Sequence, residues 1–312
     1  MLCKSPFIRD RSGRLYKAAI LSNEAFKATD LGKDLLLSGQ PFPCGQCLPC
    51  RINKRRVWTH RLMLEGFCHP SSLFVTLTYS PEFLPEGGTL VKRHLQLFLK
   101  RLRKSLSPLL FRYYAVGEYG ERYSRPHYHL ILFGLSQSHV AAVRRAWTDP
   151  ETGSPVGLVH VGNGQRLSYQ YVAGYVTKKY VKKSDNFVPE FATMSRRPGI
   201  GYPALEKVQL LMNNPVFQKM VHIDQDVPKG LMHGQKWWPF GRYLVEKLRQ
   251  MIESGWTDEK WYAEIRQKYV EHLASCDERV FFERMQDETK QQIVNLEAKE
   301  RLFAQKRRFH AS

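Results

Sequence analysis

Two histidines separated by one residue lie in the segment 125–133 (RPHYHLILF). On a β-strand alternate side chains share a face, so we expect His127 and His129 to lie about 7 Å apart on one side. The apolar residues that follow would anchor the strand in the core. Two imidazoles on one face can bind a single divalent cation, whereas Tyr128 would point to the opposite face. The alternative is a pair of ordinary, partly exposed strand histidines.

A carboxylate is expected as the third ligand, because an oxygen donor beside two imidazoles suits Mg²⁺ or Mn²⁺. Glu118 ends the preceding predicted strand and can lie beside the histidines across the ladder. Glu121, in the joining loop, is the other candidate. We favour Glu118, since a strand holds its side chain rigidly. The alternative for Glu118 is a solvated carboxylate at a loop edge.

Two tyrosines, Tyr171 and Tyr175, are four residues apart in the predicted helix 167–179. This spacing places them on one helix face, with Cβ atoms about 5–6 Å apart. The small residues Ala173 and Gly174 between them would let a nucleic acid backbone approach closely. Taken alone, such a pair is more typical of the edge of a core than of a nucleophile.

Two lysines follow the tyrosine pair, Lys178 and Lys179, and one or both can reach the same helix face. A lysine there could stabilise a phenolate or hold a phosphate. A tyrosine has a pKa near 10 and is a poor nucleophile until a metal polarises the phosphodiester that it attacks. The histidine and tyrosine pairs therefore make chemical sense together, as a site that cleaves DNA.

Cysteines suggest a second metal site. Three of the six lie in one short segment, at two successive CxxC spacings: Cys44, Cys47 and Cys50. This is metal-site spacing, and a tetrahedral Zn²⁺ would need a fourth ligand. Cys3 is the first candidate, with Cys68 and His60 behind it. Such a zinc would be structural, since no open coordination position is implied. The alternative is a tight turn of reduced cysteines, because three ligands in seven residues crowd one ion.

The charge balance indicates a polyanionic partner. Forty-eight Lys and Arg stand against 29 Asp and Glu, a formal net charge of +19. Basic residues in 51–61 and 92–104 could follow a DNA backbone, although each stretch alone is more often a solvated helix face. The side chains that we expect to contact DNA are Arg51, Lys54, Arg55, Arg56 and Arg125.

These side chains must be positioned by a small set of elements. Hydrophobic periodicity and β-branched runs predict strands at 73–79, 113–118, 127–133 and 158–161. Helical spacing predicts helices at 51–65, 91–105, 136–147 and 167–179. The order β-α-β-β-α-β-α predicts an α+β fold, an antiparallel sheet with flanking helices that lie on one face.

The whole chain divides into four expected segments. With 43% hydrophobic residues it can bury a core. The segments are a basic N-terminal arm with a Cys knuckle (1–70), a nicking domain (71–183), an irregular connector (184–242) and a helical C-terminal region (243–312).

No membrane role is expected, because the chain has no run of about 18 apolar residues. The N-terminus lacks the apolar region of a secretory signal, which predicts a cytosolic protein. No GxxxxGK[ST] segment is present to drive unwinding. A DNA-cleaving role would therefore require a helicase and a polymerase from the host.

Three motifs together resemble those of HUH endonucleases, the rolling-circle replication initiators. They are the strand 74–79 (FVTLTY), the HYH segment 127–129 and the Tyr171/Tyr175 helix. The two-tyrosine form with Lys-Lys after it is similar to the initiators of the Microviridae, small single-stranded DNA phages. Cys3 and the segments 43–51 (PCGQCLPCR) and 194–201 (MSRRPGIG) resemble the gokushovirus-type initiators. The resemblance spans roughly residues 1–250.

The resemblance implies an HUH (ferredoxin-like) nicking domain, a metal-dependent tyrosine nucleophile and action in the bacterial host cytoplasm. One tyrosine attacks the viral origin DNA, single-stranded or in the replicative form. The attack leaves a 5′-phosphotyrosine and a 3′-OH for host polymerase, and the second tyrosine later resolves the circle. Which tyrosine acts first is left open. The family usually has two adjacent tyrosines near 242–248, where this chain has only Tyr243, so the role of that stretch is also open.

Three alternatives remain at this stage. A non-catalytic single-stranded nucleic-acid-binding protein would not need His127, His129 and both tyrosines together. A plasmid relaxase-like transfer enzyme usually draws three histidines to the metal, and no suitable third histidine stands near His127. A metal-dependent nuclease that uses water would leave no covalent adduct.

Overall fold

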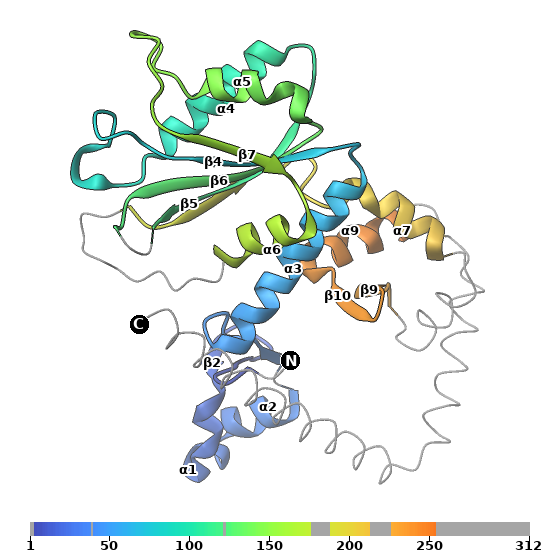
Figure 1. Cartoon of the computed structure of the whole chain (residues 1–312). Helices are drawn as coiled ribbons and strands as arrows, with labels where there is room; N and C mark the ends of the chain where they lie inside the picture. The colour runs from blue at the N-terminus through green and yellow to red at the C-terminus, as the bar shows by residue number, and fades with distance from the viewer. Residues whose placement is uncertain (1–2, 39, 121–122, 176–187, 213–225, 254–312) are drawn as a thin grey trace. The chain divides into compact units, whose positions relative to one another are not determined.

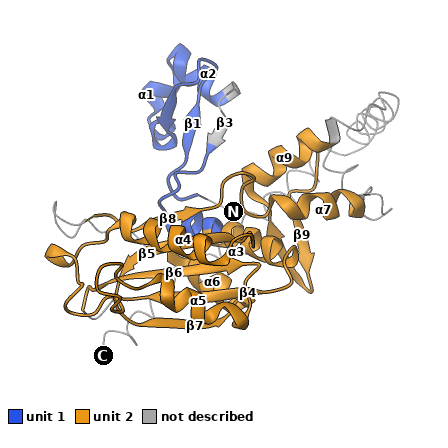
Figure 2. Cartoon of the chain, turned by 90° about the horizontal axis from the view of Figure 1, so that it is seen from above, with its two compact units in different colours: residues 1–54, 260–312 blue, residues 55–259 orange. Residues whose placement is uncertain are grey.

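A computed structural model describes residues 3–38, 40–120, 123–175, 188–212 and 226–253 (Figure 1). The chain divides into two compact units, residues 1–54 with 260–312 and residues 55–259 (Figure 2). No helix within the described ranges is long and apolar enough to cross a membrane. Whether the four segments expected from the sequence are separate domains stays a prediction.

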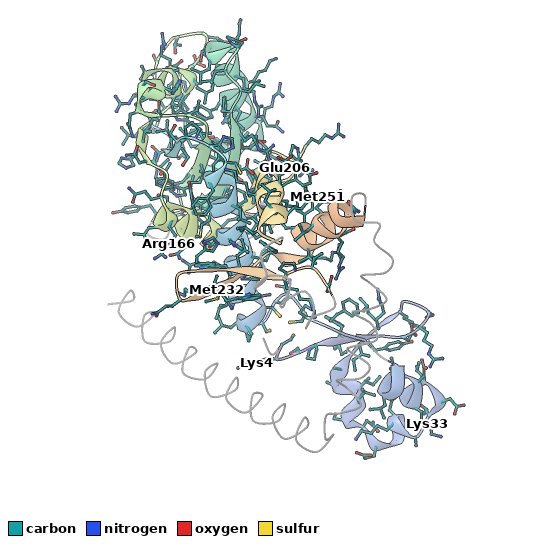
Figure 3. The ribbon with its side chains drawn as sticks, turned by 90° about the vertical axis from the view of Figure 1, so that its right-hand side faces the viewer. Lys4, Lys33, Arg166, Glu206, Met232 and Met251 are labelled. Carbon is teal, nitrogen blue, oxygen red and sulfur yellow. The ribbon has the colours of Figure 1, made fainter. Side chains whose placement is uncertain are left out.

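The first unit contains a small antiparallel sheet in strand order β2-β1-β3. Its strands are β1 (Phe7–Arg9), β2 (Leu15–Lys17) and β3 (Gln40–Phe42), and its short helices are η1 (Ala18–Ser22), α1 (Glu24–Lys27) and α2 (Asp30–Ser38). Figure 3 labels Lys33 on α2 and Lys4, which precedes β1. Apart from Pro49, the described residues of this unit bury two hydrophobic side chains, Ile8 and Leu35. Its hydrophobic core is therefore very small.

The second unit is built on a five-stranded antiparallel sheet, in the order β7-β4-β6-β5-β8. The strands are β4 (Ser72–Leu77), β5 (Arg112–Tyr119), β6 (Pro126–Phe133), β7 (Val159–Asn163) and β8 (Phe191–Met194). The predicted α+β class with an antiparallel sheet is confirmed, and so are the four predicted strands. The strand that carries both histidines, β6, lies in the middle of the sheet.

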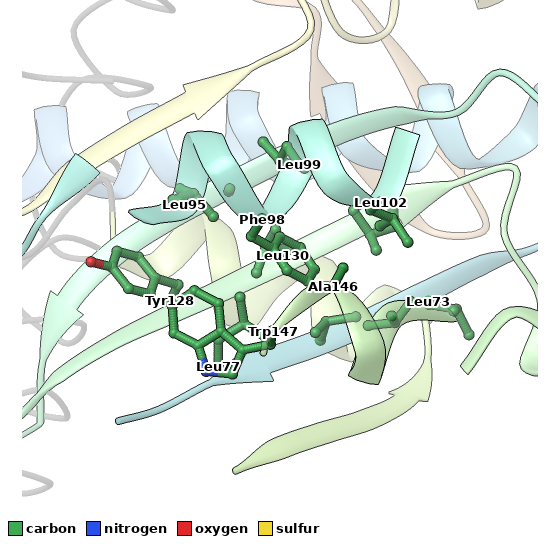
Figure 4. Packing of buried hydrophobic residues seen from close by; sticks show 14 of the residues in the cluster. Leu73, Leu77, Leu95, Phe98, Leu99, Leu102, Tyr128, Leu130, Ala146 and Trp147 are labelled. Carbon is green, nitrogen blue, oxygen red and sulfur yellow. The ribbon is translucent and has the colours of Figure 1, made fainter. Parts of the chain in front are cut away.

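One face of the sheet is covered by α4 (Lys92–Leu106) and α5 (Val140–Ala146) (Figure 1). Apolar residues of α4 recur at helical spacing and are all buried: Leu95, Phe98, Leu99 and Leu102. Figure 4 shows them packed with Leu130 of β6 and with Trp147, which follows α5. The basic residues of α4 lie outside this stripe, which is why so charged a helix can cover a core.

The other face is covered by α6 (Arg166–Tyr175) and by the part of α3 (Leu48–Phe67) that belongs to the second unit. Leu62 of α3 and Val172 of α6 pack with Tyr114, Ile131 and Phe133 of the sheet. The expectation that helices lie on only one face was therefore wrong. Strands such as β6 are apolar on both sides, a pattern typical of a sheet that is buried on both faces.

Residues 188–212 and 226–242 are not irregular, contrary to the expectation for the connector. They contain β8, which pairs with β5, and a hairpin of β9 (Gly230–His233) and β10 (Lys236–Pro239). The other elements are α7 (Leu205–Met212), α9 (Gly241–Glu253) and the single turns η2 (Glu86–Gly88), η3 (Gln137–His139) and η4 (Tyr202–Ala204). Strands of four residues are too short for hydrophobic periodicity to reveal. The remainder of the expected helical C-terminal region, 254–312, lies outside the described residues.

A buried carboxylate connects α3 to the segment 194–201. Glu65, fully buried on α3, accepts hydrogen bonds from Arg112 Nε and from the Gly201 amide at 2.7 Å, and it lies 3.2 Å from His69 Nε2. Burial alone would raise the pKa of Glu65, but the hydrogen bonds with His69, Arg112 and Gly201 lower it on balance. The MSRRPGIG motif thus joins β8 to α3, a structural role.

Candidate active site on the central strand

The site is built on β6 and its two neighbours. Glu118 of β5 is the register partner of His127, and Thr76 of β4 is the register partner of His129. Directly paired residues of an antiparallel ladder point to the same face. The four side chains therefore lie on one face of the sheet, the face on which α6 packs against β5 and β6.

His129 is held between two polar partners. Its Nε2 lies 2.7 Å from Glu118 Oε1, and its Nδ1 lies 2.9 Å from Thr76 Oγ1. Both His129 and Glu118 are buried. The Thr76 hydroxyl can accept the Nδ1 proton, which directs Nε2 and its lone pair toward the carboxylate side. Contacts of this kind orient histidine ligands in metal sites.

His127 is placed differently. Its Nδ1 lies 2.8 Å from the carbonyl oxygen of Arg125, and its ring is parallel to that of His129 with centroids 6.4 Å apart. Burial lowers the pKa of His127, and nearby His129 lowers it further, whereas the Arg125 carbonyl and Glu118 act in the opposite direction. The imidazole is therefore neutral at neutral pH, which is the form that binds metals.

The donor set fits a hard divalent cation in chemistry: two neutral imidazoles and a carboxylate. Glu118 and His129 converge, and His127 is the outlying member. Within the described ranges, the ligand atoms of these three residues do not all lie within 4.8 Å of one another. Glu121, the other candidate for the third ligand, lies outside the described residues. Metal binding here stays a prediction.

Both tyrosines of α6 lie over His129. The ring centroids of Tyr171 and Tyr175 are 5.2 Å and 5.3 Å from that of His129, and 5.0 Å from each other. Phe74 of β4 contacts both Tyr171 and His129, at 5.9 Å in each case. The expected i, i+4 pair thus shares one helix face, and that face meets the histidine strand.

The two phenols are not equivalent. Tyr171 is 47% exposed, whereas Tyr175 is half-buried. Burial raises the pKa of Tyr175 well above its usual value, and the hydrogen bond with Tyr171 and the proximity of Glu118 raise it further. Tyr175 is therefore held as a neutral phenol next to the carboxylate, and Tyr171 is the phenol that faces solvent.

The residues around the tyrosines differ in part from expectation. Ala173 is fully buried in the core beneath α6, so it offers no access for DNA. Gly174 does lie on an accessible side, but the Arg55 guanidinium is there: a Cβ at Gly174 would lie 3.6 Å from Arg55 Nε. Lys178 and Lys179 lie outside the described residues, so their proposed part in catalysis stays a prediction.

Tyr128 points away from the site, as predicted from strand alternation. Its hydroxyl donates to the Val91 carbonyl at 2.9 Å, accepts from the Val91 amide at 3.0 Å and lies 2.9 Å from Tyr79 Oη. It is fully buried in the core under α4. The central tyrosine of the HYH segment thus holds the start of α4 in place.

Comparison with known proteins matches the part of the chain that carries this site. Residues 72–180 match a family model described as a replication-associated protein of the ORF2 type. The replication-associated protein ORF2 of Spiroplasma virus 4 is 28% identical over 267 residues, 79% of this chain and 78% of the relative. The chain belongs to the replication-associated proteins of the Microviridae type.

Two further relatives have the same kind of name. The replication-associated protein VP4 of Bdellovibrio phage phiMH2K is 30% identical over 196 residues, 55% of this chain and 59% of the relative. The replication-associated protein ORF4 of Chlamydia phage 1 is 25% identical over 252 residues, 74% of this chain and 59% of the relative. These two matches span less than two thirds of the relatives' own length. No solved structure matches the chain.

In this microvirus-type protein the expected DNA-contacting residues have different surroundings. Lys54 and Arg55 are exposed on α3, and Arg55 Nε donates to the Gln170 carbonyl of α6 at 3.3 Å. Arg56 donates to the Trp237 carbonyl, and Arg125 donates to the Tyr79 carbonyl at 2.7 Å. Arg55 is therefore the basic residue best placed to reach a phosphate beside the tyrosine helix. DNA contact by these residues and by Arg51 stays a prediction.

The cysteine segment forms a cluster in the first unit. The sulfur atoms of four residues lie within 4.8 Å of one another: Cys3, Cys44, Cys47 and Cys50. Hydrogen bonds from the amides of Cys47 and Gln46 lower the pKa of Cys44 to about 6, whereas burial raises the pKa of Cys50 to about 12. The second-choice ligand His60 is elsewhere, with Nδ1 3.0 Å from the Pro239 carbonyl and Nε2 2.9 Å from His233 Nε2.

Sequence reasoning missed one residue on the catalytic face. His160 of β7 is the register partner of Thr76, which is itself paired with His129. A third histidine therefore does lie on this face, exposed and one strand removed from the ligand pair. Its alternation within β7 was readable, but the neighbour of β7 in the sheet was not. Tyr243, in the stretch of open role, accepts a hydrogen bond from the Gly199 amide at 2.9 Å.

Proposed function

We propose that this chain initiates phage DNA replication by nicking and rejoining one viral DNA strand at the origin through a 5′-phosphotyrosine intermediate. The observation that carries the proposal is the stacking of two phenols on one imidazole. Tyr171 and Tyr175 both contact His129, and His129 is hydrogen-bonded to Glu118. A binding protein without chemistry has no need for this arrangement, nor for the replacement of core contacts by a buried polar pair.

The proposed reaction is a double transfer. The Oη of one tyrosine attacks the scissile phosphorus, a new Oη–P bond forms and the P–O3′ bond breaks. The departing O3′ takes up a proton as a 3′-OH, which a host polymerase extends. The second tyrosine then cleaves the regenerated origin in the same way. The newly released 3′-OH attacks the first phosphotyrosine, which restores the phenol and closes the single-stranded circle.

Residues of β5 and β6 would hold a Mg²⁺ or Mn²⁺ ion for this reaction: His127, His129 and Glu118. Such an ion supplies charge stabilisation and polarises the phosphodiester. The protein's own residues position the reactants. Thr76 and the Arg125 carbonyl orient the two imidazoles, and α6 presents the phenols to them. Lys178 and Lys179, on the chain just after α6, are proposed to stabilise the attacking phenolate or the phosphate.

The difference in exposure suggests the order of the two tyrosines. Tyr171 is accessible, and its ring lies against His129 at 5.2 Å. Tyr175 is held neutral beside Glu118 by burial. We therefore assign the first cleavage to Tyr171 and the second to Tyr175, whose pKa falls to a useful range only when positive charge arrives at Glu118.

The proposal also defines partners. The substrate is viral single-stranded or replicative-form DNA, drawn by a net charge of +19 and by the exposed basic side of α3 at Lys54 and Arg55. A host helicase would unwind the duplex and a host polymerase would extend the 3′-OH. The reaction would take place in the bacterial host cytoplasm.

Tiled oligonucleotides of the viral strand test the proposal, each labelled at one end and incubated with the full chain and Mn²⁺. Cleavage by a tyrosine leaves the 3′-labelled fragment bound to the protein on a denaturing gel, whereas the 5′-labelled fragment is released and can be extended by a polymerase. Changing both Tyr171 and Tyr175 to Phe should abolish the bound band. Tyr171→Phe alone should reduce it much more than Tyr175→Phe.

Tyr169→Phe is the matched control, since Tyr169 lies on the same helix but is buried, with its hydroxyl 2.9 Å from Ser72 Oγ. It should retain the adduct. Glu118→Ala should remove the dependence on added metal together with the activity. Cleavage without any adduct would instead indicate a nuclease that uses water, and DNA binding without cleavage would indicate a binding protein. A bound band that survives the double substitution would contradict the proposal.

A further inference from the structure

Four cysteines from two distant segments converge in the first unit. Cys3 precedes β1, whereas Cys44, Cys47 and Cys50 surround the start of α3. Their sulfur atoms all lie within 4.8 Å of one another, and Cys3 Sγ and Cys47 Sγ are 3.8 Å apart. All four are unbridged thiols of intermediate burial. Cys50 joins the group because it lies in the first turn of α3, which resolves the crowding expected of three ligands in seven residues.

The sulfur spacing distinguishes a metal site from disulfides. A disulfide requires an S–S separation of about 2.05 Å. In a tetrahedral site with Zn–S bonds of about 2.3 Å, neighbouring sulfurs are about 3.8 Å apart. The 3.8 Å between Cys3 and Cys47 equals the second value. Four sulfurs within 4.8 Å need only a small contraction to surround one ion.

Backbone amides support the sulfurs as they do in thiolate metal sites. The Cys44 amide donates to Cys3 Sγ at 3.2 Å, and the Cys47 amide donates to Cys44 Sγ at 3.4 Å. The turn that permits this passes through Gly45 with φ +73°, a left-handed conformation that favours glycine. Such N–H···S contacts stabilise negative charge on sulfur and orient the ligands.

The small core of the first unit points independently to a stabilising ligand. Ile8 and Leu35 are its buried hydrophobic side chains in the described part, together with Pro49. Domains of this size rarely fold on so little buried apolar surface, and metals or disulfides usually supply the missing stability. An ion held by Cys3 and Cys44 would also close a chain loop between residues 41 positions apart.

We propose that Cys3, Cys44, Cys47 and Cys50 bind one Zn²⁺ as four thiolates. Four protein ligands leave no open coordination position, so the ion is structural and takes no part in the DNA chemistry. Its role is to tie the strand β1 to the start of α3 and so to fold the first unit. Binding releases the thiol protons, and the free energy of binding becomes free energy of folding for residues 3–54.

Metal analysis of the full chain tests the assignment, on protein made in zinc-supplemented medium and purified without chelators. We expect one zinc per chain, released on titration of four thiols by a mercurial. After exchange, Co²⁺ should show the intense visible bands of a tetrahedral thiolate site. Removing zinc with a chelator should increase proteolysis within residues 3–54 by about tenfold or more, with cleavage in 55–253 unchanged.

Cys47→Ser should lower the zinc content to well below one per chain, whereas Cys68→Ser, outside the cluster, should leave it unchanged. The measurements on the unaltered chain do not depend on whether Cys47→Ser folds. Zinc-free protein, a bound iron chromophore, or oxidised Cys pairs in protein purified without oxygen would each overturn the proposal. Adduct formation with DNA is a separate readout, so the zinc assignment and the nicking mechanism can fail independently.

Discussion

The two units of this protein reach stability by different routes. In the second unit both faces of a five-stranded sheet are covered, and its core includes Trp147, Phe98 and Phe133 at 1% exposure or less. In the first unit the described residues bury little beyond Ile8 and Leu35, and four sulfurs gather where a core would be expected. The difference shows that a chain can use hydrophobic burial where it needs rigidity for catalysis and metal ligation where it needs only a small anchored module.

The largest expected effect comes from the core of the sheet. Trp147 packs on Tyr79, Phe98 and Tyr128, and its Nε1 donates to the Thr78 carbonyl at 2.8 Å. Trp147→Ala should cost about 4 kcal/mol in the free energy of unfolding, because it opens a cavity and leaves a carbonyl without its donor. Chemical denaturation followed by circular dichroism measures the loss. Zinc content should stay at one per chain; loss of zinc together with the sheet would show that the two units fold as one.

A somewhat smaller effect is expected at the buried carboxylate. Glu65→Gln should destabilise the second unit by about 3 kcal/mol at pH 7, since it leaves the Arg112 guanidinium without its anionic partner. The folded-state pKa of Glu65 is lowered, so its contribution is present above about 4.5 and is lost as the pH falls toward the lowered pKa. Urea titrations of both proteins at pH 7 and pH 4 should therefore differ less at pH 4. An equal difference at both values would exclude the ion pair as the cause.

The small core of the first unit provides the next test. Leu35 is 2% exposed on α2, and Leu35→Ala should cost about 2 kcal/mol, the low end for such a truncation, because few neighbours surround it. The variant should still hold its zinc. Limited proteolysis of residues 3–54 and metal analysis on the same sample measure both. If Leu35→Ala releases the zinc, the hydrophobic contact and not the metal dominates this unit, and the contrast between the units disappears.

The smallest effect is expected at Tyr128. Tyr128→Phe removes hydrogen bonds to the Val91 backbone and should cost about 1–2 kcal/mol. Adduct formation with DNA should be unchanged, since the hydroxyl lies on the far face of the sheet from Tyr171. Denaturation and the denaturing-gel assay test both parts. Loss of the adduct in a folded variant would mean that the tyrosine inside the HYH segment takes part in the chemistry.

Much of the fold was predictable, because its main elements carry strong local patterns. The β-branched, apolar run of β4 and the stripe of Leu95, Phe98, Leu99 and Leu102 on α4 needed no tertiary information. The strand β8 was missed because its four residues show no clear alternation, and its position beside β5 depends on the link between Gly201 and Glu65. The burial of both sheet faces was also missed, since a sequence does not state which helix covers which side.

The candidate site was predictable in composition but not in arrangement. Strand alternation placed His127 and His129 on one face and Tyr128 on the other, and helical spacing paired Tyr171 with Tyr175. The unequal exposure of the two phenols was not predictable, because it depends on how α6 packs against β5 and β6. His160 was missed for the same kind of reason: its approach to Thr76 requires knowing that β7 pairs with β4.

The central position of β6 has a consequence for motion. Its backbone is hydrogen-bonded to β4 on one side and β5 on the other, so the amides of His127 and His129 should exchange with solvent only when the whole sheet opens. The helix α6 lies on the surface of the sheet and can shift without breaking any of those bonds. Movement during strand transfer would then belong to the phenols, which change places over an imidazole that stays still.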